Sequence, residues 1–440
     1  MEQKSYPPAG LAWLVWGLGA AFYFAGFFHR MAPAVMTDQL MAEFHIGATA
    51  LGNFTAFYFY SYFLIQVPTG ILADHWGPRK LLTAGSLIIA VGTFLFASAT
   101  AILPANLGRL LIGGAAGFGF VALLAISARW FPARIYATLS GLALFCGVSG
   151  AVSAGVPLRM LVDGFGWRPV MFAAAALLLV TGGAIWVIVR DDPAQRGYRS
   201  YSHPDHASAP FSWKAMMADM GEVFRYRNIR ILSLVGAGIT GPVMAFAGLW
   251  GVPFFTTHYG MPTTSSSAVT STLLICYALG GLLSGALSDR MGRRKPVMLV
   301  SSLIALIAWV PILFVPNLPV WLLILLVIAV GLAAGSVIVG FAYAKESVPL
   351  RFAGTVSGVY NMGSMAGAII LQPAIGWFLD LNWRGTLAGG IRFYDLNAYR
   401  AGFVLIVAFA ALSVLLTAFT EETHCRQAAT PDRDSGKADH

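Results

Sequence analysis

G-I-L-A-D-H-W-G-P-R-K, residues 70–80, is the segment from which the architecture of this chain can be read. It recurs in the second half of the chain as residues 285–295, G-A-L-S-D-R-M-G-R-R-K. Each copy lies between two long apolar runs, so each is expected to form a short polar turn between two membrane helices. The glycine after the Asp allows a tight turn, the Asp can cap a helix terminus, and the Arg-Lys pair suits an anionic membrane surface.

The composition excludes a soluble protein. Of the 440 residues, 58% are hydrophobic and 11% are charged, whereas soluble proteins carry about 25% charged residues. The net charge of +9 does not indicate nucleic-acid binding, because the basic residues lie in short segments between apolar runs and form no continuous patch. Cys146 and Cys276 lie in apolar runs and Cys425 in the polar tail, so neither a disulfide framework nor a metal cluster is expected.

The apolar runs are long enough to cross a bilayer, which takes about 20 residues in a helix. We predict twelve such helices, at residues 11–36, 48–73, 81–101, 103–128, 137–161, 168–190, 229–257, 266–288, 296–315, 319–344, 353–379 and 399–420. An even number of spans places both termini on the same side of the membrane.

Lys and Arg residues predict which side that is. With a cytoplasmic N-terminus, most basic residues, including Arg79, Lys80, Arg294 and Lys295, fall in inside segments. The outside segments hold only Arg159, Arg168, Arg384, Arg392 and Arg400. Because cytoplasmic loops are enriched in Lys and Arg, we expect a multi-pass protein of the inner (plasma) membrane with both termini cytoplasmic.

Further repeats divide the chain into two homologous halves. F-P-A-R-I-Y-A-T-L-S-G at 131–141 matches V-P-L-R-F-A-G-T-V-S-G at 348–358, and a Trp-Arg pair at 167–168 recurs at 383–384. The spacing between copies is nearly constant, which indicates an internal duplication. We therefore predict six-helix bundles at 1–190 and 228–420, a cytoplasmic linker at 191–227 and a cytoplasmic tail at 421–440. Residues 213–224 of the linker are amphipathic and are expected to lie along the inner leaflet.

The duplicated G-x-L-x-D-x-x-G-x-R-K pattern resembles the signature of the major facilitator superfamily, and the resemblance covers about residues 11–420. It implies an all-α membrane protein with twelve transmembrane helices in two pseudo-symmetric six-helix bundles. The substrate site of that fold lies between the halves near the middle of the bilayer. No paired carboxylates, metal-spaced His/Cys sets or phosphate-binding loops are found, so we predict neither an enzyme nor a cofactor.

Two arginines inside predicted spans are the informative residues, because a charge within the bilayer is costly and usually functional. Arg30 follows Trp13 and Arg109 precedes Trp130 by distances that place both about 25–30 Å from the cytoplasmic interface. No Asp or Glu occurs in the interior of a predicted span. Two uncompensated guanidiniums at one depth suit an anion, because their planar forks match carboxylate or phosphate.

Both arginines lie in segments that resemble family motifs. F-F-H-R-M-A-P-A-V-M around Arg30 resembles the first helix of the anion:cation symporter branch, which implies that Arg30 binds an anionic substrate. R-L-L-I-G-G from Arg109 resembles a fourth-helix motif whose arginine can instead bind main-chain carbonyls, so a structural or coupling role for Arg109 stays open.

His29 stands where that branch has an Asp. Histidine titrates near neutral pH, so we predict that it carries the coupled proton, with a bound anion favouring its protonation beside Arg30. A hydrogen-bonded packing histidine is the alternative.

Uncharged polar residues complete the predicted substrate site. Asn53, Tyr60 (or Tyr58) and Gln66 lie near helical spacing in the second span. The polar candidates in the tenth and eleventh spans of the second half are Tyr343, Tyr360, Asn361 and Gln372. The repeat position of Arg109 is Leu326, so we expect anion capture in the first half and shape selection in the second.

The two signature loops are predicted to form charge clusters that change during transport. Their residues are Gly70, Asp74, Gly77 and Arg79, and Gly285, Asp289, Gly292 and Arg294. By resemblance to the family, the Asp and Arg of each loop interact near Arg134 or Arg351; simple topology anchoring is the alternative.

Together these features predict a monomeric secondary transporter that works by alternating access and takes up a small organic anion, such as a carboxylate or sugar acid, with protons. One alternative is a carrier of amino acids or other zwitterions, because the first helix and F-Y-F-Y-S-Y at 57–62 also resemble phagosomal-type nutrient carriers. Another is proton-coupled efflux of metabolites or drugs, disfavoured because the small-residue run at 147–157 only partly resembles the antiporter motif. A non-transport sensor is disfavoured by the short polar segments.

Overall fold

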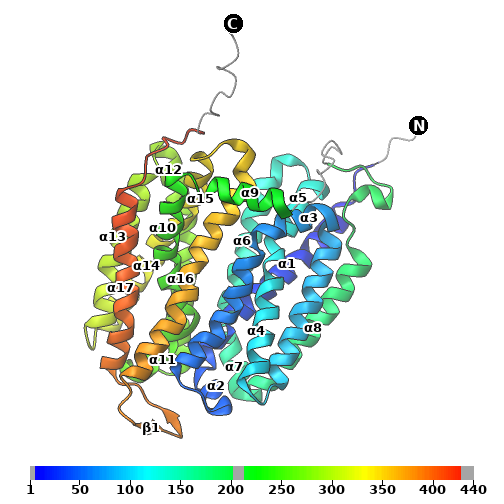
Figure 1. Ribbon diagram of the computed structural model, residues 1–440. Coiled ribbons are helices and arrows are strands. Elements are labelled where there is room, and N and C mark those ends of the chain that lie inside the picture. The colour runs from blue at the N-terminus through cyan, green and yellow to red at the C-terminus, as the bar shows by residue number, and fades with distance from the viewer. Residues whose placement is uncertain (1–4, 202–212, 428–440) are drawn as a thin grey trace.

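The computed structural model describes residues 5–201 and 213–427, apart from the side chains at positions 70, 71, 74, 137 and 215. Its long helices run side by side between the two ends of the molecule (Figure 1). One end carries the short helix α9 (Trp213–Val223), and we call it the linker end. The other carries helix α2 (Thr37–Phe44) and the two-stranded hairpin β1–β2 (Leu387–Ala388 and Ile391–Arg392), and we call it the hairpin end.

The first half of the described chain provides six helical spans. They are α1 (Ala9–Met31) with the 3-10 turn η1 (Ala32–Val35), the two arms of α3 (Ala48–Ser98), α4 (Ile102–Ala116) with α5 (Phe118–Trp130), α6 (Tyr136–Ser153) with α7 (Val156–Phe165), and α8 (Trp167–Ile188). Helix α3 contains two spans because Gly77, in the first signature loop, has a positive φ of 77° and kinks it. A short 3-10 turn, η2 (Ala133–Ile135), precedes α6.

The second half of the described chain repeats this arrangement. Its spans are α10 (Arg227–Ala245), the π turn η4 (Phe246–Trp250) and α11 (Gly251–Tyr259), then α12 (Thr263–Met291), α13 (Lys295–Phe314), α14 (Val320–Ala334) with α15 (Val337–Glu346), α16 (Ala353–Leu381) and α17 (Leu396–Ala418). Two further 3-10 turns are η3 (Pro193–Arg196), in the linker, and η5 (Leu350–Phe352), before α16.

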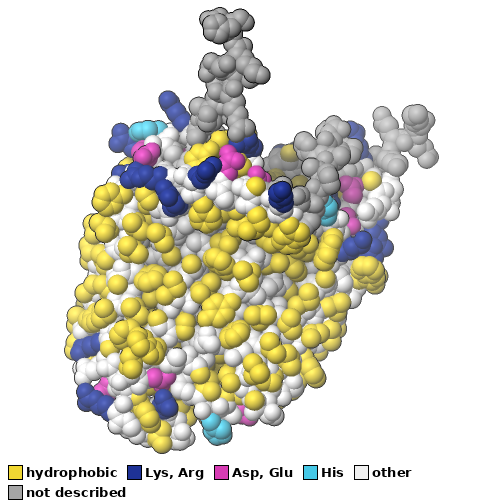
Figure 2. Space-filling model, viewed as in Figure 1, with side chains coloured by type: hydrophobic (Ala, Val, Ile, Leu, Met, Phe, Trp, Pro, Cys, Tyr) yellow, Lys and Arg dark blue, Asp and Glu magenta, His cyan; other side chains and the backbone are white. Residues whose placement is uncertain are grey.

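The twelve predicted apolar runs coincide with these helices to within a few residues. Among the described residues, eleven helices are long and apolar enough to cross a membrane. The run 48–73, which includes positions whose side chains are not described, is not among the eleven, but it is helical as the first arm of α3. Figure 2 shows hydrophobic side chains over the middle of the visible face and charged side chains gathered at the two ends, as expected for a protein in a bilayer.

Two spans are interrupted at repeat-related glycines. The break between α4 and α5 falls at Gly117 in G-G-A-A-G, and that between α14 and α15 begins at Gly335 in G-L-A-A-G. A side chain at Gly113 would collide with the Tyr58 main chain, and one at Gly335 with the main chain of Gly280 and Gly281. The glycines therefore allow α4 to pack closely on α3, and the α14–α15 junction on α12.

The two halves meet extensively at the hairpin end. There α3 packs against α16, α7 against α12, and η1 against η4. A side chain at Gly52 would collide with the main chain of Gln372, and one at Gly376 with that of Ala48. At the linker end, Arg351 of η5 bonds Glu222 of α9, with Nη2 and Oε1 2.8 Å apart. The α3–α16 contact also extends toward the linker end, where a side chain at Gly358 would meet Val67.

The predicted amphipathic segment of the linker forms α9, which packs on α16. The boundaries predicted for the bundles, linker and tail stay predictions. Parts of the linker (202–212) and of the tail (428–440) lie outside the described residues.

Candidate functional site

Arg30 lies in a cage of aromatic rings inside the first half of the molecule. It is 5% exposed, near the end of α1. Its guanidinium carbon lies 4.3 Å from the ring centre of Phe27, 4.6 Å from that of Tyr62 and 5.4 Å from that of Tyr58. Its Nε donates a hydrogen bond to the Tyr58 hydroxyl at 3.3 Å. Ring faces attract a cation, so the cage holds the charge without a carboxylate.

Arg109 lies beside the same tyrosine. It is 2% exposed, in α4, and its Nη1 donates a 2.6 Å hydrogen bond to the main-chain carbonyl of His29. Its guanidinium carbon lies 5.1 Å from the ring centre of Tyr58 and 5.6 Å from that of Phe54. The two arginines therefore share Tyr58 as a neighbour and lie at one level, as the spacing along the sequence predicts.

Several polar atoms of this cluster have no hydrogen-bond partner among the described residues. They are Nε and Nη2 of Arg109 and Nε2 of His29. His29 is 3% exposed, and its Nδ1 lies 2.8 Å from the carbonyl oxygen of Ala25, so Nδ1 carries the hydrogen of that bond. Among the described residues, no Asp or Glu is buried. Because a buried charge without partners is costly, the cluster is suited to an anion that accepts from the free N–H groups.

The other polar residues predicted in the second span are spread over two places. Tyr60 donates its hydroxyl hydrogen to Oδ1 of Asn53 at 2.7 Å, within α3. Gln66 accepts a 2.6 Å hydrogen bond from Nδ2 of Asn361, which joins α3 to α16 across the two halves. Contacts with the arginines are instead made by Tyr58, Tyr62 and Phe27.

Three second-half candidates make contacts within that half. Tyr360 is fully buried, donates to the main-chain carbonyl of Val337 at 3.1 Å and packs on Phe341. Tyr343 donates to the Glu421 carbonyl at 2.7 Å, near the end of α17. Gln372 donates to the Met244 carbonyl at 3.1 Å.

The first signature loop is held by the end of α8 and the residues after it. The main-chain N–H of Arg79 donates to Oδ1 of Asp191 at 2.7 Å, and its guanidinium donates to the Trp186 carbonyl and lies 4.2 Å from that indole ring. A side chain at Gly77 would collide with Asp191. Gly70 and Asp74 lie in α3, and the Asp74 side chain is outside the described part of the structure, so the predicted Asp74–Arg79 contact stays a prediction.

The second signature loop forms a compact ion-pair network. Helix α12, which contains Gly285, ends at Gly292 with φ 60°, and Arg294 then contacts Asp289 at 2.6 Å and Glu346 at 2.7 Å. Burial alone would lower the pKa of the Arg294 guanidinium, but its hydrogen bonds to Glu346 and Asp289 raise it. The guanidinium therefore stays charged.

Glu422 of the tail extends this network. Its carboxylate accepts hydrogen bonds from the main-chain N–H groups of Arg294 and Lys295, which begin α13. Arg134 and Arg351, predicted near these loops, lie in η2 and η5.

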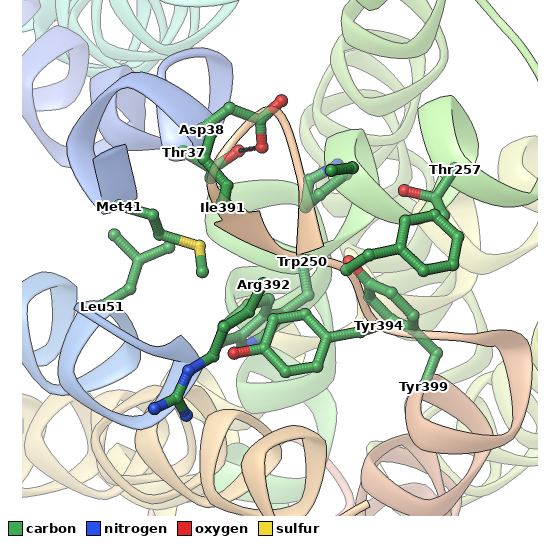
Figure 3. Close-up of a pocket in the computed structure, with 13 residues that line it drawn as sticks. Thr37, Asp38, Met41, Leu51, Trp250, Thr257, Ile391, Arg392, Tyr394 and Tyr399 are labelled. Atoms are coloured by element: carbon green, nitrogen blue, oxygen red, sulfur yellow. Dashed lines mark hydrogen bonds between the residues drawn. The ribbon is translucent and has the colours of Figure 1, made fainter. Parts of the chain in front are cut away.

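A cavity of about 210 Å³ lies between the halves at the hairpin end. Thr37, Met41 and Leu51 line it from the first half, and Trp250, Tyr394 and Tyr399 from the second. Figure 3 shows these groups facing one another, with Arg392 beside them. None of Arg30, Arg109, His29 and Tyr58 lines this cavity, so it is separate from the arginine cluster.

Relatives of this chain are transporters. One is an "Uncharacterized transporter YybO" of Bacillus subtilis (strain 168), 25% identical over 433 residues, which are 92% of this chain and 94% of that protein. Another is the "Probable galactarate/D-glucarate transporter GarP" of Escherichia coli (strain K12), 21% identical over 419 residues, 89% of this chain and 90% of that protein.

A solved structure supports the fold. A bacterial homolog of the human lysosomal transporter Spinster, in an inward-facing, occupied conformation, aligns with a TM-score of 0.73 at 17% identity, covering 94% of this chain and 98% of that one. This likeness confirms the predicted fold of twelve helices in two bundles.

The family model described as "Major Facilitator Superfamily" matches residues 15–265 and 230–438. This match accounts for the duplicated signature loops, the two bundles and the helical spans, and it identifies a transporter of small molecules rather than an enzyme. The chain belongs to the Major Facilitator Superfamily of multi-pass membrane transporters.

Proposed function

We propose that this protein is a secondary transporter of a small organic anion, such as a carboxylate or sugar acid, and that Arg30 and Arg109 bind the anion. The observation that carries the proposal is the pair of buried guanidiniums that both lie near the ring of Tyr58, with no buried carboxylate among the described residues. Arg109 has two N–H groups free to donate, and an anion would accept them. A relative named as a galactarate/D-glucarate transporter fits a substrate of this class.

The aromatic cage favours a planar, weakly hydrated anionic group over a small hard ion. The rings of Phe27 and Tyr62 lie 4.3 and 4.6 Å from the Arg30 guanidinium carbon, and a planar guanidinium matches the planar shape of a carboxylate. An amino acid would bring an ammonium group as well, and no buried Asp or Glu of the described chain could pair with it. The site therefore suits a simple anion better than a zwitterion.

Transport proceeds by alternating access, with the linker end at the cytoplasm. The packing of α3 on α16 and of η1 on η4 closes the hairpin end in the described conformation. Most Lys and Arg of the short segments belong to the linker end, which supports a cytoplasmic location for it and for both termini in the inner (plasma) membrane. One chain supplies both bundles, so the protein acts as a monomer.

His29 carries the coupled proton in this proposal. Its Nε2 is buried without a partner among the described residues, and its carbonyl oxygen binds Arg109. An anion near the arginines would offset the repulsion between them and a protonated imidazole, so anion and proton bind more tightly together than apart. Reciprocal coupling of this kind gives symport.

The experiment that tests the proposal is the thermal stability of the purified full-length protein with panels of organic anions, amino acids and neutral sugars. A ligand at 100 times its dissociation constant stabilises by about 2.7 kcal/mol. Only anions should raise the melting temperature, and Arg30→Ala should abolish the effect. Arg384→Ala is the matched control, because Arg384 is exposed at the hairpin end.

Two results would redirect the assignment. Stabilisation by amino acids that exceeds that of matched simple carboxylates would identify a zwitterion carrier. Equal stabilisation of wild type and Arg30→Ala by neutral or cationic compounds would make Arg30 structural and favour efflux.

A further inference from the structure

The first turn of α3 is capped from the other half of the molecule. Asp380, at the end of α16, accepts hydrogen bonds from the main-chain N–H of Ala48 at 3.2 Å, from that of Thr49 at 2.8 Å and from the Thr49 hydroxyl at 2.5 Å. The N-terminal N–H groups of a helix have no partner within the helix and need an acceptor. The N-cap residue Gly47 has no side chain to serve, so the acceptor comes from the opposite bundle.

Two side chains of the segment after α16 hold the Asp380 carboxylate in place. Arg392 of β2 lies with Nη1 3.0 Å from Oδ1, and the Tyr394 hydroxyl donates to the same oxygen at 2.6 Å. The Tyr394 hydroxyl also accepts from the Ala48 N–H at 3.0 Å. Arg392 stacks on Trp383, 4.5 Å from the ring centre. The segment between α16 and α17 is thus folded around the Asp380 carboxylate, which points toward the other bundle.

The surrounding backbone is shaped for close approach of the two helices. Side chains added at Gly47, Gly52 or Gly376 would meet Asp380, Gln372 and Ala48 respectively. Asp380 is half-buried there, and charge-assisted hydrogen bonds are stronger away from water. The hairpin end therefore combines tight packing with one concentrated polar contact.

We propose that Asp380 is the latch of the hairpin end: its bonds to Ala48 and Thr49 hold the two bundles together in the described state and break once in each transport cycle. This inference rests on alternating access as proposed above, and not on the identity of the substrate. Opening the hairpin end exposes the α3 N–H groups and the carboxylate to water, which can solvate both. The latch is therefore reversible, and its strength sets the ratio of closed to open molecules.

Accessibility of a cysteine placed in the cavity at the hairpin end tests the latch. Thr257→Cys is introduced into a full-length protein in which Cys146, Cys276 and Cys425 are replaced by Ser, and the rate of labelling by a bulky maleimide is measured in detergent. Thr257 is half-buried in the described state, and separation of the bundles would expose it further to the reagent. Asp380→Ala should raise the labelling rate ten-fold or more.

Asp395→Ala is the matched control. Asp395 lies in the same segment and accepts from the Ala398 N–H at 2.8 Å, so it caps α17 within its own half. Its loss should lower the melting temperature without changing the labelling rate. Thr49→Val removes one latch bond from the other bundle and should raise labelling by a smaller factor, which provides a second test should Asp380→Ala fold poorly.

Labelling of Asp380→Ala and Thr49→Val at the wild-type rate would overturn the latch. So would equal acceleration by Asp395→Ala, because loosening of the whole segment would then explain the effect. Neither outcome bears on anion binding, which the thermal-shift experiment measures separately. Conversely, loss of the anion assignment would leave the labelling result intact.

Discussion

The guanidinium of Arg109 in α4 donates a hydrogen bond to the main-chain carbonyl of His29 in α1, with 2.6 Å between Nη1 and O. This bond connects the buried Arg109 guanidinium to the residue next to Arg30. It uses only some of the N–H groups that the guanidinium can donate. We expect Arg109→Lys to keep the charge but lose the paired N–H groups, because an ammonium cannot present two parallel donors. Anion affinity should fall by about 1.5–3 kcal/mol, the usual value of a charged hydrogen bond.

Titration of an anion that stabilises the wild type measures this loss. Arg168→Lys serves as the control, because Arg168 binds the carbonyls of Ala97 and Ala99 at the hairpin end, outside the arginine cluster. Unchanged anion affinity in Arg109→Lys would assign Arg109 to helix packing alone.

Tyr58→Phe is predicted to weaken anion binding without unfolding the protein. The Tyr58 hydroxyl accepts from Arg30 and donates to the Gly26 carbonyl at 3.2 Å, whereas its ring contacts both arginines. Removing the hydroxyl should cost about 1 kcal/mol of stability and release Arg30 from its fixed orientation. Tyr60→Phe loses only the bond to Asn53 and should bind the anion like wild type. Identical affinities in the two variants would count against an orienting role for Tyr58.

His29→Gln is predicted to remove the pH dependence of transport. Glutamine cannot gain a proton, so uptake into proteoliposomes should no longer respond to a pH gradient. Anion binding in the absence of a gradient should persist, because Arg30 and Arg109 are unchanged. A His29→Gln protein that transports at the wild-type rate with the wild-type pH profile would exclude His29 as the proton carrier.

Gly52→Val is predicted to shift the protein toward the state open at the hairpin end. A side chain there would press against the main chain of Gln372 in the other bundle, and overpacking costs about 1–3 kcal/mol. Maleimide labelling of the thiol introduced by Thr257→Cys should therefore accelerate. Gly363→Ala is the control, because its contact lies within the second half. The Cβ added at position 363 would lie 2.5 Å from the Cβ of Ser233. Acceleration in the control as well would indicate general loosening.

Glu422→Gln is predicted to alter stability in a pH-dependent way. Burial would raise the pKa of the Glu422 carboxyl, but hydrogen bonds from main-chain N–H groups, including those of Arg294 and Lys295, lower it. The stabilisation is therefore fully present above pH 4.5, the ordinary pKa of this carboxyl, and is lost as the pH falls through the lower pKa of the folded state. Melting temperatures of wild type and Glu422→Gln should differ at neutral pH and converge in acid.

Glu421→Gln provides the comparison for that series. Glu421 pairs with Arg227 on the surface, where ion pairs contribute little. Its melting temperature should follow that of wild type at every pH. A constant difference between Glu422→Gln and wild type down to the acid limit would contradict the capping role of Glu422.

The sequence predicts the helices well because each span is a long apolar run bounded by polar residues. It does not predict α2 or the β1–β2 hairpin, since Thr37–Phe44 and Leu387–Arg392 are too short to show a long apolar pattern. Helix α2 packs on α3 and on β2 of the other half. The breaks at Gly117 and Gly335 are visible only once α3 and α12 lie against those glycines.

For the candidate site, the sequence identifies the arginines but not their neighbours. A charge in an apolar run stands out, whereas F-Y-F-Y-S-Y is aromatic on every side, so its pattern cannot show which tyrosine faces Arg30. The spacing of Phe27 to Arg30, and of Tyr58 to Tyr62, is the one signal that could have indicated the cage. The Asp380 contact joins residues 331 positions apart and leaves no local pattern.

Both guanidiniums of the cluster belong to the first bundle, and the second bundle has Leu326 at the position related to Arg109. Under the proposed mechanism, the substrate therefore stays bound to the first bundle while the second bundle moves relative to it. The ionic contacts between the substrate and the two arginines need not break and re-form during the change of access. The energetic barrier to turnover would then reside in the contacts that close each end, and mutations that change the charged group recognised on the substrate would lie in the first bundle.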